Sequence, residues 1–534
     1  MPLDATEKSP EKSAIVDTRG ASSGTIDVPT TSYGQILKSS AWIGGSSILT
    51  IGIGVVRTKA MAVMLGPAGF GLMGLYNSII DLALAAASMG IGSAGVRQIA
   101  ESVASGDEPK IARTVVVLRR TAVILGILGV GLLVAFCRTV STLTFGSDEH
   151  AGAVALVGLA VFFRLLSGAQ GALLQGMRRI HDLAVMGVVG ALLGAVISVV
   201  LVFFFGEQGV APSLVAGAAM GLAVSWWYSR KVKIPLSRMK RAEFTQEAVS
   251  LLKLGVAFMV TGLLMMGSAY AARAIVLHFD GLEAAGVYTA AWTLGGLYVG
   301  IILQAMGADF YPRLVGVAND NHECNRLVNE QTLVSLLLAG PGVIGTIVFA
   351  PLVISLFYSP EFAEAVEVLR WICLGIGMRA LTWPMGFIIV AKNRQMLFIA
   401  SDVAWTCLNI SLTLLCVDSF GVTGAGMAFF GSYLFHLLLI YPIVRHLSGF
   451  RWSLQNVQVA IINLVVLILV FCGSYFIEPM PLMALGAVAV TLSGFYSART
   501  LVTLVSWAQI PRRLRFILVW LRMGPPATAG SRVV

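Results

Sequence analysis

Fourteen apolar segments follow one another along this chain of 534 residues, and most are long enough to cross a membrane as a helix. A helix needs about 20 residues to span ~30 Å of hydrocarbon. A soluble domain could not bury a chain that is 57% hydrophobic and only 12% charged. The sequence therefore predicts an all-α polytopic membrane protein. The segments are 40–64, 71–96, 121–137, 151–175, 183–205, 209–228, 254–278, 285–308, 331–357, 366–390, 396–416, 421–443, 456–477 and 481–504.

Two of these segments are irregular. The third, 121–137, is short for a span, and the ninth, 331–357, is interrupted by Pro341 and Pro351. Proline removes a helical hydrogen bond, so a break in the ninth segment is expected.

Basic residues gather at alternate ends of the segments. With the N-terminus inside, 30 of the 37 Lys and Arg residues flank cytoplasmic ends, and the outer loops hold only Arg138 and Arg370. Cytoplasmic loops of membrane proteins carry such an excess. Both termini are therefore expected inside, and the net charge of +10 does not call for a nucleic-acid partner.

The chain repeats itself at a constant offset of 215 in the numbering. Helix ends and loop charges coincide at this offset, so residues 36–230 and 251–445 are interpreted as two copies of a six-helix unit. Because six is even, both copies enter from the same side, which predicts parallel lobes related by an axis along the membrane normal, with a site between them. Matching pairs include Lys38 and Lys253, Gly66 and Gly281, Gly71 and Gly286, Arg164 and Arg379, Arg179 and Arg394, and Gly206 and Gly421.

The repeat divides the chain into six parts. We expect a disordered cytoplasmic tail, an N-lobe of six helices, a basic cytoplasmic linker, a C-lobe of six helices, two further membrane helices, and a basic amphipathic tail on the inner leaflet. In the same order, these parts span 1–39, 40–230, 231–253, 254–447, 448–505 and 506–534.

Five basic residues lie inside predicted membrane helices, where a charge costs about 2.5–3.5 kcal/mol and usually faces a cavity or a partner. Arg164 and Arg379 lie mid-helix at equivalent repeat positions. They either form structural ion pairs or face a ligand cavity, and we favour the cavity. Arg57, Lys59 and Arg273 lie towards the outer ends of their helices, where long basic side chains can also extend to the headgroups.

Acidic and amide side chains supply the candidate counter-ions. Asp81 lies one helical turn after Asn77, so both occupy one helix face. Asp81 is interpreted in two ways: as a counter-ion for Arg57 or Lys59, or as a group that binds H⁺ or Na⁺ and couples transport to a gradient. Asp402 is a further candidate, although polar groups of this kind also hold helices together.

Motifs for cofactors and catalysis do not occur. No P-loop, zinc spacing or Ser/Cys–His arrangement is found, and the six cysteines are scattered. The stretch "GIGSAG" at 90–95 matches a dinucleotide pattern, but it ends a membrane helix and follows no strand. We therefore expect a protein that is not an enzyme and that needs no cofactor or metal.

The first apolar segment ends in a distinctive motif. In "VVRTKAMAVMLGPAGFG", residues 55–71, late basic residues run into a Gly-Pro turn, and the next helix ends in small residues followed by Arg97. This arrangement resembles the N-terminal signature of Wzx-type flippases for lipid-linked oligosaccharides, in the multidrug/oligosaccharidyl-lipid/polysaccharide (MOP) exporter superfamily. The resemblance extends to about residue 447.

The resemblance implies a V-shaped pair of lobes around a cationic cavity that opens alternately to each side of the bacterial inner membrane. The implied substrate is a polyprenyl-diphosphate-linked oligosaccharide, such as an O-antigen or exopolysaccharide repeat unit, moved from the cytoplasmic to the outer leaflet. Its implied partners are membrane lipids and the polysaccharide polymerase and glycosyltransferase machinery. A diphosphate needs fixed cations shielded from water. The residues expected to supply them are Arg57, Lys59, Arg164, Arg273 and Arg379.

Three alternatives are kept. The two C-terminal helices depart from the twelve-helix form common in Wzx proteins and leave a lipid II flippase open. A multidrug or cation antiporter would favour acidic residues in its cavity, whereas the membrane segments here hold five basic residues against chiefly Asp81 and Asp402. A polysaccharide polymerase or ligase would need a large catalytic loop outside, and the longest outer loops have about 15 residues.

Overall fold

The computed structural model describes residues 31–232 and 239–504, which are almost entirely helical and contain no strand. The helices are α1 (Thr31–Ser88), α2 (Ile91–Ala104), α3 (Glu108–Ala135), α4 (Cys137–Phe145), α5 (Ala151–Gly176), α6 (Ile180–Phe205), η1 (Gly206–Gly209), α7 (Val210–Ser229), α8 (Arg241–Gly316), α9 (Asn321–Val348), α10 (Ala350–Phe357), η2 (Pro360–Phe362), α11 (Ala365–Ala391), α12 (Gln395–Phe420), α13 (Val422–Ser448), α14 (Leu454–Phe476) and α15 (Pro479–Leu504).

Eleven helical stretches of the described chain are long and apolar enough to cross a membrane. Three of them, Gly45–Ser88, Ile180–Ser229 and Phe258–Gly300, are 43 to 50 residues long. Each therefore has the length of two crossings at about 20 residues per crossing. The polytopic all-α fold is confirmed, while the count of fourteen spans stays a prediction.

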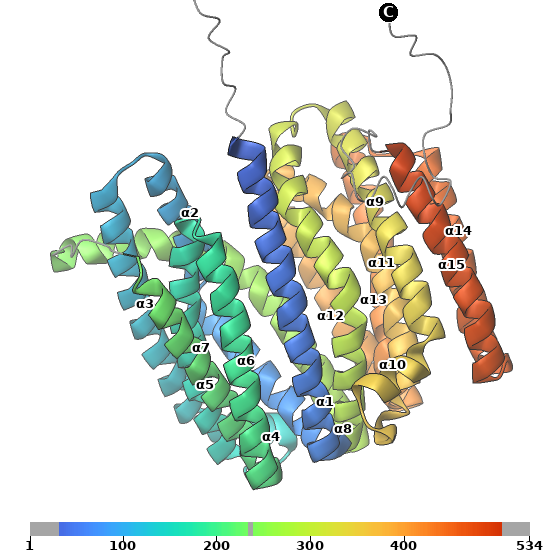
Figure 1. The fold of residues 1–534 in the computed structure, drawn as a ribbon, viewed down its shortest axis with the longest axis horizontal. Coiled ribbons are helices and arrows are strands. Elements are labelled where there is room, and N and C mark those ends of the chain that lie inside the picture. The colour runs from blue at the N-terminus through green and yellow to red at the C-terminus, as the bar shows by residue number, and fades with distance from the viewer. Residues whose placement is uncertain (1–30, 233–238, 505–534) are drawn as a thin grey trace, which may run out of the picture.

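Two of the long helices turn sharply at a glycine. Gly66 in α1 has φ 62° and ψ −174°, and Gly281 in α8 has φ 84° and ψ −174°. Glycine adopts positive φ without the steric cost of a side chain. Pro67 then suits the first turn of the helical segment that follows. In Figure 1, α1 starts at the upper end of the molecule and turns at the lower end.

The structure shows the sequence repeat in three dimensions. The turns at Gly66 and Gly281 are separated by the repeat offset. Helices α6 and α12 are offset by 215 at both ends, and the glycines that follow them, Gly206 and Gly421, both have positive φ. The break between α3 and α4 has its counterpart between α9 and α10. The two-lobed internal repeat is therefore present in the structure, with α14 and α15 packed on α9 outside it. Six membrane helices per lobe stay a prediction.

The irregular segments differ from their predicted ranges. Helix α3 begins at Glu108, well before 121, and the Asp107 side chain caps it by accepting a hydrogen bond from the Lys110 amide at 2.9 Å. Helix α9 ends at Val348, and Pro351 lies in the first turn of α10. Hydropathy marks only the part of a helix inside hydrocarbon, so polar helical extensions beyond it were missed.

Two predicted coil regions are partly helical. Helix α1 begins at Thr31, so residues 31–39 of the predicted disordered tail are helical. Helix α8 begins at Arg241, inside the predicted linker 231–253. Residues 1–30, 233–238 and 505–534, including the predicted amphipathic tail, lie outside the described residues. The domain boundaries themselves stay predictions.

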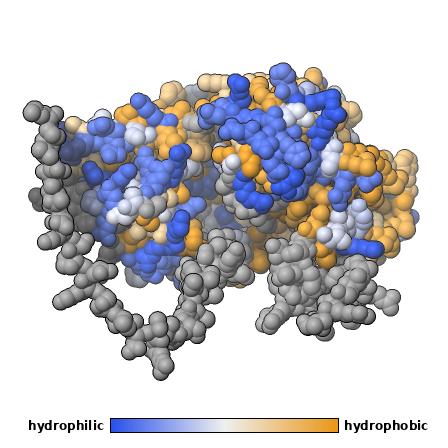
Figure 2. Space-filling view, turned by 90° about the horizontal axis from the view of Figure 1, so that it is seen from above, coloured by the Kyte–Doolittle hydropathy of each residue, from blue (hydrophilic) through white to orange (hydrophobic). Residues whose placement is uncertain are grey.

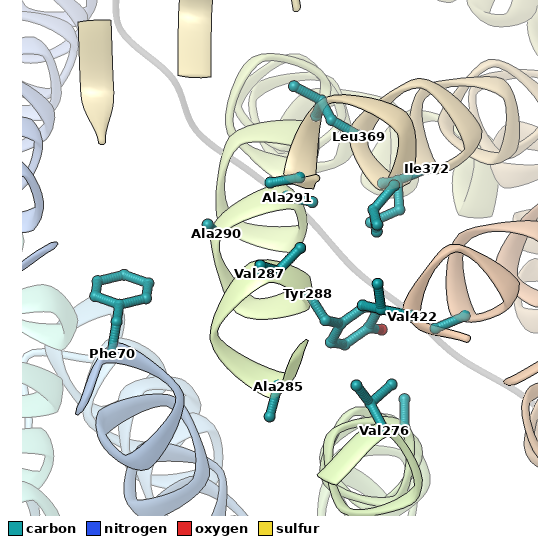
Figure 3. Packing of buried hydrophobic residues seen from close by; sticks show 14 of the residues in the cluster. Phe70, Val276, Ala285, Val287, Tyr288, Ala290, Ala291, Leu369, Ile372 and Val422 are labelled. Atoms are coloured by element: carbon teal, nitrogen blue, oxygen red, sulfur yellow. The ribbon is translucent and has the colours of Figure 1, made fainter. Parts of the chain in front are cut away.

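The lobes meet along α1 and α8, the pair of helices with the most extensive mutual packing. Phe70 of α1 faces the part of α8 that carries Val287 and Ala290, while Tyr288 points away towards Val422 (Figure 3). The start of α1 and the end of α15 lie at the same end of the bundle (Figure 1). Viewed from that end, hydrophilic residues gather in patches on the surface (Figure 2), as expected for the predicted cytoplasmic side.

Candidate functional site

Arg164, in the middle of α5, makes an ion pair across the N-lobe. Its Nη1 donates to Asp81 Oδ1 at 2.9 Å and its Nη2 donates to Asn77 Oδ1 at 3.1 Å. Asp81 and Asn77 share one face of the second half of α1, as predicted. The counter-ion of Asp81 is thus Arg164, and the interpretation that paired Asp81 with Arg57 or Lys59 is corrected.

Two further arginines lie near this ion pair. Arg57, from the first half of α1, is repelled by Arg164, and Arg273, from the first half of α8, is attracted by Asp81. The buried Nε atoms of Arg57 and Arg273 have no hydrogen-bond partner among the described residues. Arg273 Nη1 donates to the Ala269 carbonyl of its own helix, at 3.0 Å. Helices from both lobes thus bring three arginines together.

This arginine cluster, defined as Arg57, Arg164 and Arg273, carries an excess of positive charge. Asp81 neutralises one of the three guanidinium groups and leaves two. The cluster also faces an opening, because 33% of the Arg164 side chain and 45% of the Asp81 side chain are accessible. Uncompensated cations in a membrane protein usually face a cavity that carries a charged ligand or ion. The arrangement therefore suits a multiply charged anion.

A cavity of about 420 Å³ adjoins the cluster inside the N-lobe. Arg57, Arg164 and Ser167 line it, and the opposite wall is formed by small residues of α6 and α7. Gly194 and Gly217 lie opposite each other on these two helices, and a Cβ on Gly194 would make an ordinary van der Waals contact, 3.7 Å from the Gly217 Cα. The glycines thus form a smooth wall beside the guanidinium groups.

Lys59 lies apart from the arginine cluster. Its Nζ donates to the backbone carbonyls of Ser355, at 2.9 Å, and of Tyr358, at the end of α10 in the other lobe. Phe70 packs beside this contact, with its ring edge-on to Tyr358 at 5.4 Å and to Phe362 at 5.7 Å between centroids. Lys59 therefore joins the two lobes.

Backbone contacts continue this junction. A Cβ on Gly71 would overlap the Leu282 carbonyl oxygen, and a Cβ on Gly286 would overlap the Pro67 carbonyl oxygen. The two glycines are equivalent in the repeat, as are Pro67 and Leu282. We call the junction formed by Lys59, Phe70, Gly71, Gly286, Tyr358 and Phe362 the outer seam, after its predicted side.

Arg379 and Asp402 occupy a different cavity, of about 220 Å³, within the C-lobe. Helices α8, α11, α12 and α13 form its walls, which carry several aromatic side chains. The structure thus distributes the eight residues predicted from sequence over three places. Arg57, Arg164, Arg273, Asp81 and Asn77 lie together, Lys59 lies in the outer seam, and Arg379 and Asp402 line the C-lobe cavity.

The sequence also matches a known protein family. A family model described as "Polysaccharide biosynthesis protein" matches residues 60–367, more than half of the chain. The chain belongs to this family. The family resemblance predicted from the late basic residues and the Gly-Pro turn is thereby confirmed.

Relatives of this polysaccharide biosynthesis protein include named flippases. Lipid III flippase of Escherichia coli (strain K12) is 22% identical over 412 residues, which cover 76% of this chain and 97% of the flippase. The probable low-salt glycan biosynthesis flippase Agl15 of Haloferax volcanii is 22% identical over 401 residues, covering 74% of this chain and 80% of the relative. The succinoglycan biosynthesis transport protein ExoT of Rhizobium meliloti is 22% identical and covers 66% of this chain and 68% of its own length.

Solved structures share the fold. The lipid II flippase MurJ, in an inward closed conformation, aligns with a TM-score of 0.64 at 13% identity and covers 87% of this chain and 98% of that structure. An inward-facing MATE family transporter of the MOP superfamily aligns with a TM-score of 0.63, also at 13% identity, and covers 74% and 95%. These likenesses confirm the fold predicted for the family.

Sequence reasoning missed the neutral polar residues of this family member. Trp405, Thr406, Tyr433 and His436 line the same cavity as Arg379, but they carry no permanent charge and do not stand out in an apolar segment. The one available signal was His436, an ionisable residue inside a predicted membrane helix. Among the described residues, no group of three or more His, Cys, Asp or Glu is placed to hold a metal ion.

Proposed function

We propose that this polysaccharide biosynthesis protein is a flippase that moves a polyprenyl-diphosphate-linked oligosaccharide from the cytoplasmic to the outer leaflet of a bacterial inner membrane. The observation that carries the proposal is the arginine cluster, in which three guanidinium groups lie near a single carboxylate. The naming of the relatives as flippases of lipid III and of glycan biosynthesis supports it.

The diphosphate is the part of such a substrate that the cluster recognises. Guanidinium groups bind phosphate oxygens through paired, charge-assisted hydrogen bonds. Arg57 and Arg273 each keep a buried Nε without a partner among the described residues, so both have donor capacity for an incoming anion. The two uncompensated positive charges favour an anion that carries more than one negative charge.

Arg164 gives the site a way to respond to its ligand. Without a ligand, Arg164 is held by Asp81 and Asn77. A diphosphate competes with Asp81 for the same guanidinium group, and the released carboxylate is then free to take up H⁺ or Na⁺. This exchange would link binding of the lipid headgroup to an ion gradient.

Transport requires the outer seam to part. In the described conformation, Lys59 and the ring of Phe70 bridge α1 to the segment that contains Tyr358 and Phe362. A cavity that is closed at this end and open at the other would load the headgroup and sugars from the cytoplasmic side. Separation of the seam, with closure at the opposite end, would release them outside, where a polymerase or glycosyltransferase would use the unit.

The cation antiporter alternative fits the site less well. A cationic drug would have to enter a cluster that already holds two excess positive charges, and like charges in a membrane cavity repel strongly. An anionic headgroup reverses the sign of this interaction. The charge balance of the cluster therefore favours the flippase over the antiporter.

The test is genetic and quantitative. Cells that lack the protein should accumulate the undecaprenyl-diphosphate-linked unit and lose the surface polysaccharide, and the wild-type gene should restore both. The double variant Arg57→Ala, Arg273→Ala should not restore export, while Arg138→Ala, which removes an exposed arginine from α4, should restore it fully. Equal membrane amounts of the variants are verified by immunoblot. Full export by the double variant would refute the proposal.

A further inference from the structure

The C-lobe cavity that contains Arg379 and Asp402 is unused by the diphosphate site. It lies among α8, α11, α12 and α13 and has a volume of about 220 Å³. Trp383, Phe387, Trp405 and Tyr433 are among its wall residues, so flat aromatic rings surround a small number of polar groups. Ligand sites combine apolar walls with a few placed polar groups in this manner.

Three buried polar atoms on the walls of this cavity have no hydrogen-bond partner among the described residues. They are the indole Nε1 of Trp405, the hydroxyl of Thr406 and the Nδ1 of His436. Thr406 is only 8% exposed. Buried polar groups are nearly always paired, because an unpaired one keeps its desolvation cost. Three such atoms around one cavity indicate a ligand that supplies both donors and acceptors.

Comparison of the two lobes shows that Arg379 lacks a counter-ion. Its repeat equivalent, Arg164, is paired with Asp81 and Asn77. At the repeat offset, the counterparts of these two partners are Gly296 and Trp292, which carry no carboxylate or amide. Within the described part of the chain, no hydrogen bond or ion pair engages the Arg379 guanidinium group. The C-lobe therefore has the arginine of the repeat but lacks a partner for it at the equivalent positions.

The combination of groups selects a class of ligand. A hydrocarbon tail would leave Arg379, Asp402 and the three unpaired atoms unmatched. A second diphosphate would be repelled by Asp402, the cavity's one carboxylate among the described residues. A sugar ring carries hydroxyl groups that donate and accept at its edge and C–H groups on its face, so it matches both the polar groups and the aromatic walls.

We infer that the C-lobe cavity binds a sugar ring of the glycan, while the arginine cluster binds the diphosphate of the same molecule. This inference rests on the proposed flippase function. Drug-sized ligands occupy cavities of about 300–1,000 Å³, so a cavity of about 220 Å³ accepts a single ring and not a whole oligosaccharide.

Helix α8 connects the two sites. Met265 lines the sugar cavity, and Arg273 of the arginine cluster follows it by eight residues on the same helix. At a rise of 1.5 Å per residue, this separation is about 12 Å along the helix axis. The first sugars attached to a bound diphosphate extend over a distance of this order, so one substrate molecule reaches both places.

The experiment compares two lipids on the purified full-length protein in nanodiscs. One is undecaprenyl diphosphate, and the other is the undecaprenyl-diphosphate-linked oligosaccharide extracted from source cells depleted of this protein. Their affinities are measured by native mass spectrometry. The double variant Trp405→Phe, Thr406→Val removes two of the unpaired donors and keeps an aromatic ring at position 405. Trp227→Phe, at a tryptophan that is 63% exposed, serves as its matched control.

The wild type and Trp227→Phe should bind the oligosaccharide lipid more tightly than the sugar-free lipid. In Trp405→Phe, Thr406→Val this preference should fall about tenfold, as expected for the loss of two hydrogen bonds, with affinity for undecaprenyl diphosphate unchanged. A preference that survives in the double variant, or is absent from the wild type, overturns the sugar site alone. Failure of the wild type to bind either lipid overturns the proposed function itself.

Discussion

At the scale of single residues, the pairing of Arg164 with Asp81 decides how the site is used. The ion pair is 2.9 Å long and partly accessible, so a ligand can reach it. The Asp81 carboxylate therefore competes with any anion that binds the Arg164 guanidinium group. Removal of the carboxylate should therefore affect binding and transport in opposite directions.

Asp81→Asn tests this competition. The amide keeps the shape of the side chain but gives up the negative charge, so undecaprenyl diphosphate should bind several-fold more tightly in nanodiscs. Export should fall, because the headgroup is released slowly and no carboxylate is left to take up an ion. Weaker binding by Asp81→Asn would contradict the competition and assign Asp81 to positioning Arg164.

Lys59 offers a second test at this scale. Because its Nζ bonds the backbone of Ser355 and Tyr358, and not the arginine cluster, it should act on the closure of the outer seam. Lys59→Ala should lower export but leave the affinity for undecaprenyl diphosphate within about twofold of the wild type. Arg57→Ala should weaken that affinity by about tenfold or more, since hydrogen bonds to charged groups contribute ~1.5–3 kcal/mol. Equal losses of affinity in both variants would place Lys59 in the ligand site.

These residues also show how far sequence reasoning reaches. An isolated charge in an apolar segment is visible in the sequence, so the arginines of the cluster and Asp81 were all predicted as candidates. Partner choice was not visible, because Asp81 finds its counter-ion on α5, 83 residues away. Thr406 and Trp405 were missed because their importance lies in burial without a partner among the described residues, which only packing reveals.

At the scale of helices, the contact between Gly71 and Gly286 sets the distance between α1 and α8. A methyl group on Gly286 would overlap the Pro67 carbonyl oxygen, a backbone atom that cannot rotate away. Gly296, ten residues along on the same helix, has open space where its Cβ would lie. The two positions therefore form a matched pair for substitution.

Gly286→Ala should lower the stability of the detergent-solubilised protein by about 1–3 kcal/mol, the usual cost of an overpacked contact. Gly296→Ala should be neutral, or more stable by up to ~1 kcal/mol, because alanine is the better helix former. Thermal unfolding followed by circular dichroism measures both. Equal stability of the two variants would show that the α1–α8 contact does not constrain the lobes.

The helices themselves were predicted better than their ends. The apolar cores of α3 and α9 were found, but their starts at Glu108 and Asn321 were not. Polar turns outside the hydrocarbon continue a helix without any hydropathy signal, and aspartates at 107 and 320 cap them. Recognition of Asp107 and Asp320 as helix caps would have moved the predicted starts of these two helices to the observed ones.

At the scale of the whole molecule, the proposed transport cycle requires the outer seam to open. Cysteines introduced by Phe70→Cys and Tyr358→Cys would face each other across the seam, since the two rings they replace are 5.4 Å apart. A short bifunctional thiol reagent that bridges them should abolish export, and each single cysteine variant should keep it. The introduced cysteines are placed in a variant that lacks the six native cysteines, so that the reagent cannot link other positions. Undiminished export by the bridged protein would show that the seam stays closed throughout.

The architecture at this scale was the most predictable part of the molecule. The repeat offset was read from matching glycines and arginines, and the structure repeats its turns at the same spacing. The difference between the lobes was harder to foresee, because Gly296 and Trp292 stand at the positions equivalent to Asp81 and Asn77. A repeat is recognised from the positions at which its two copies agree, so it does not predict where the two lobes differ.

The contact at Gly71 and Gly286 is reciprocal between the two lobes. Gly71 contacts the carbonyl of Leu282, and Gly286 contacts the carbonyl of Pro67. Leu282 and Pro67 are equivalent in the repeat, as are the two glycines. A surface that contacts its own equivalent in this way is the signature of a two-fold homodimer. The two lobes therefore meet through equivalent surfaces, as two subunits of a symmetric dimer do, although both belong to one polypeptide.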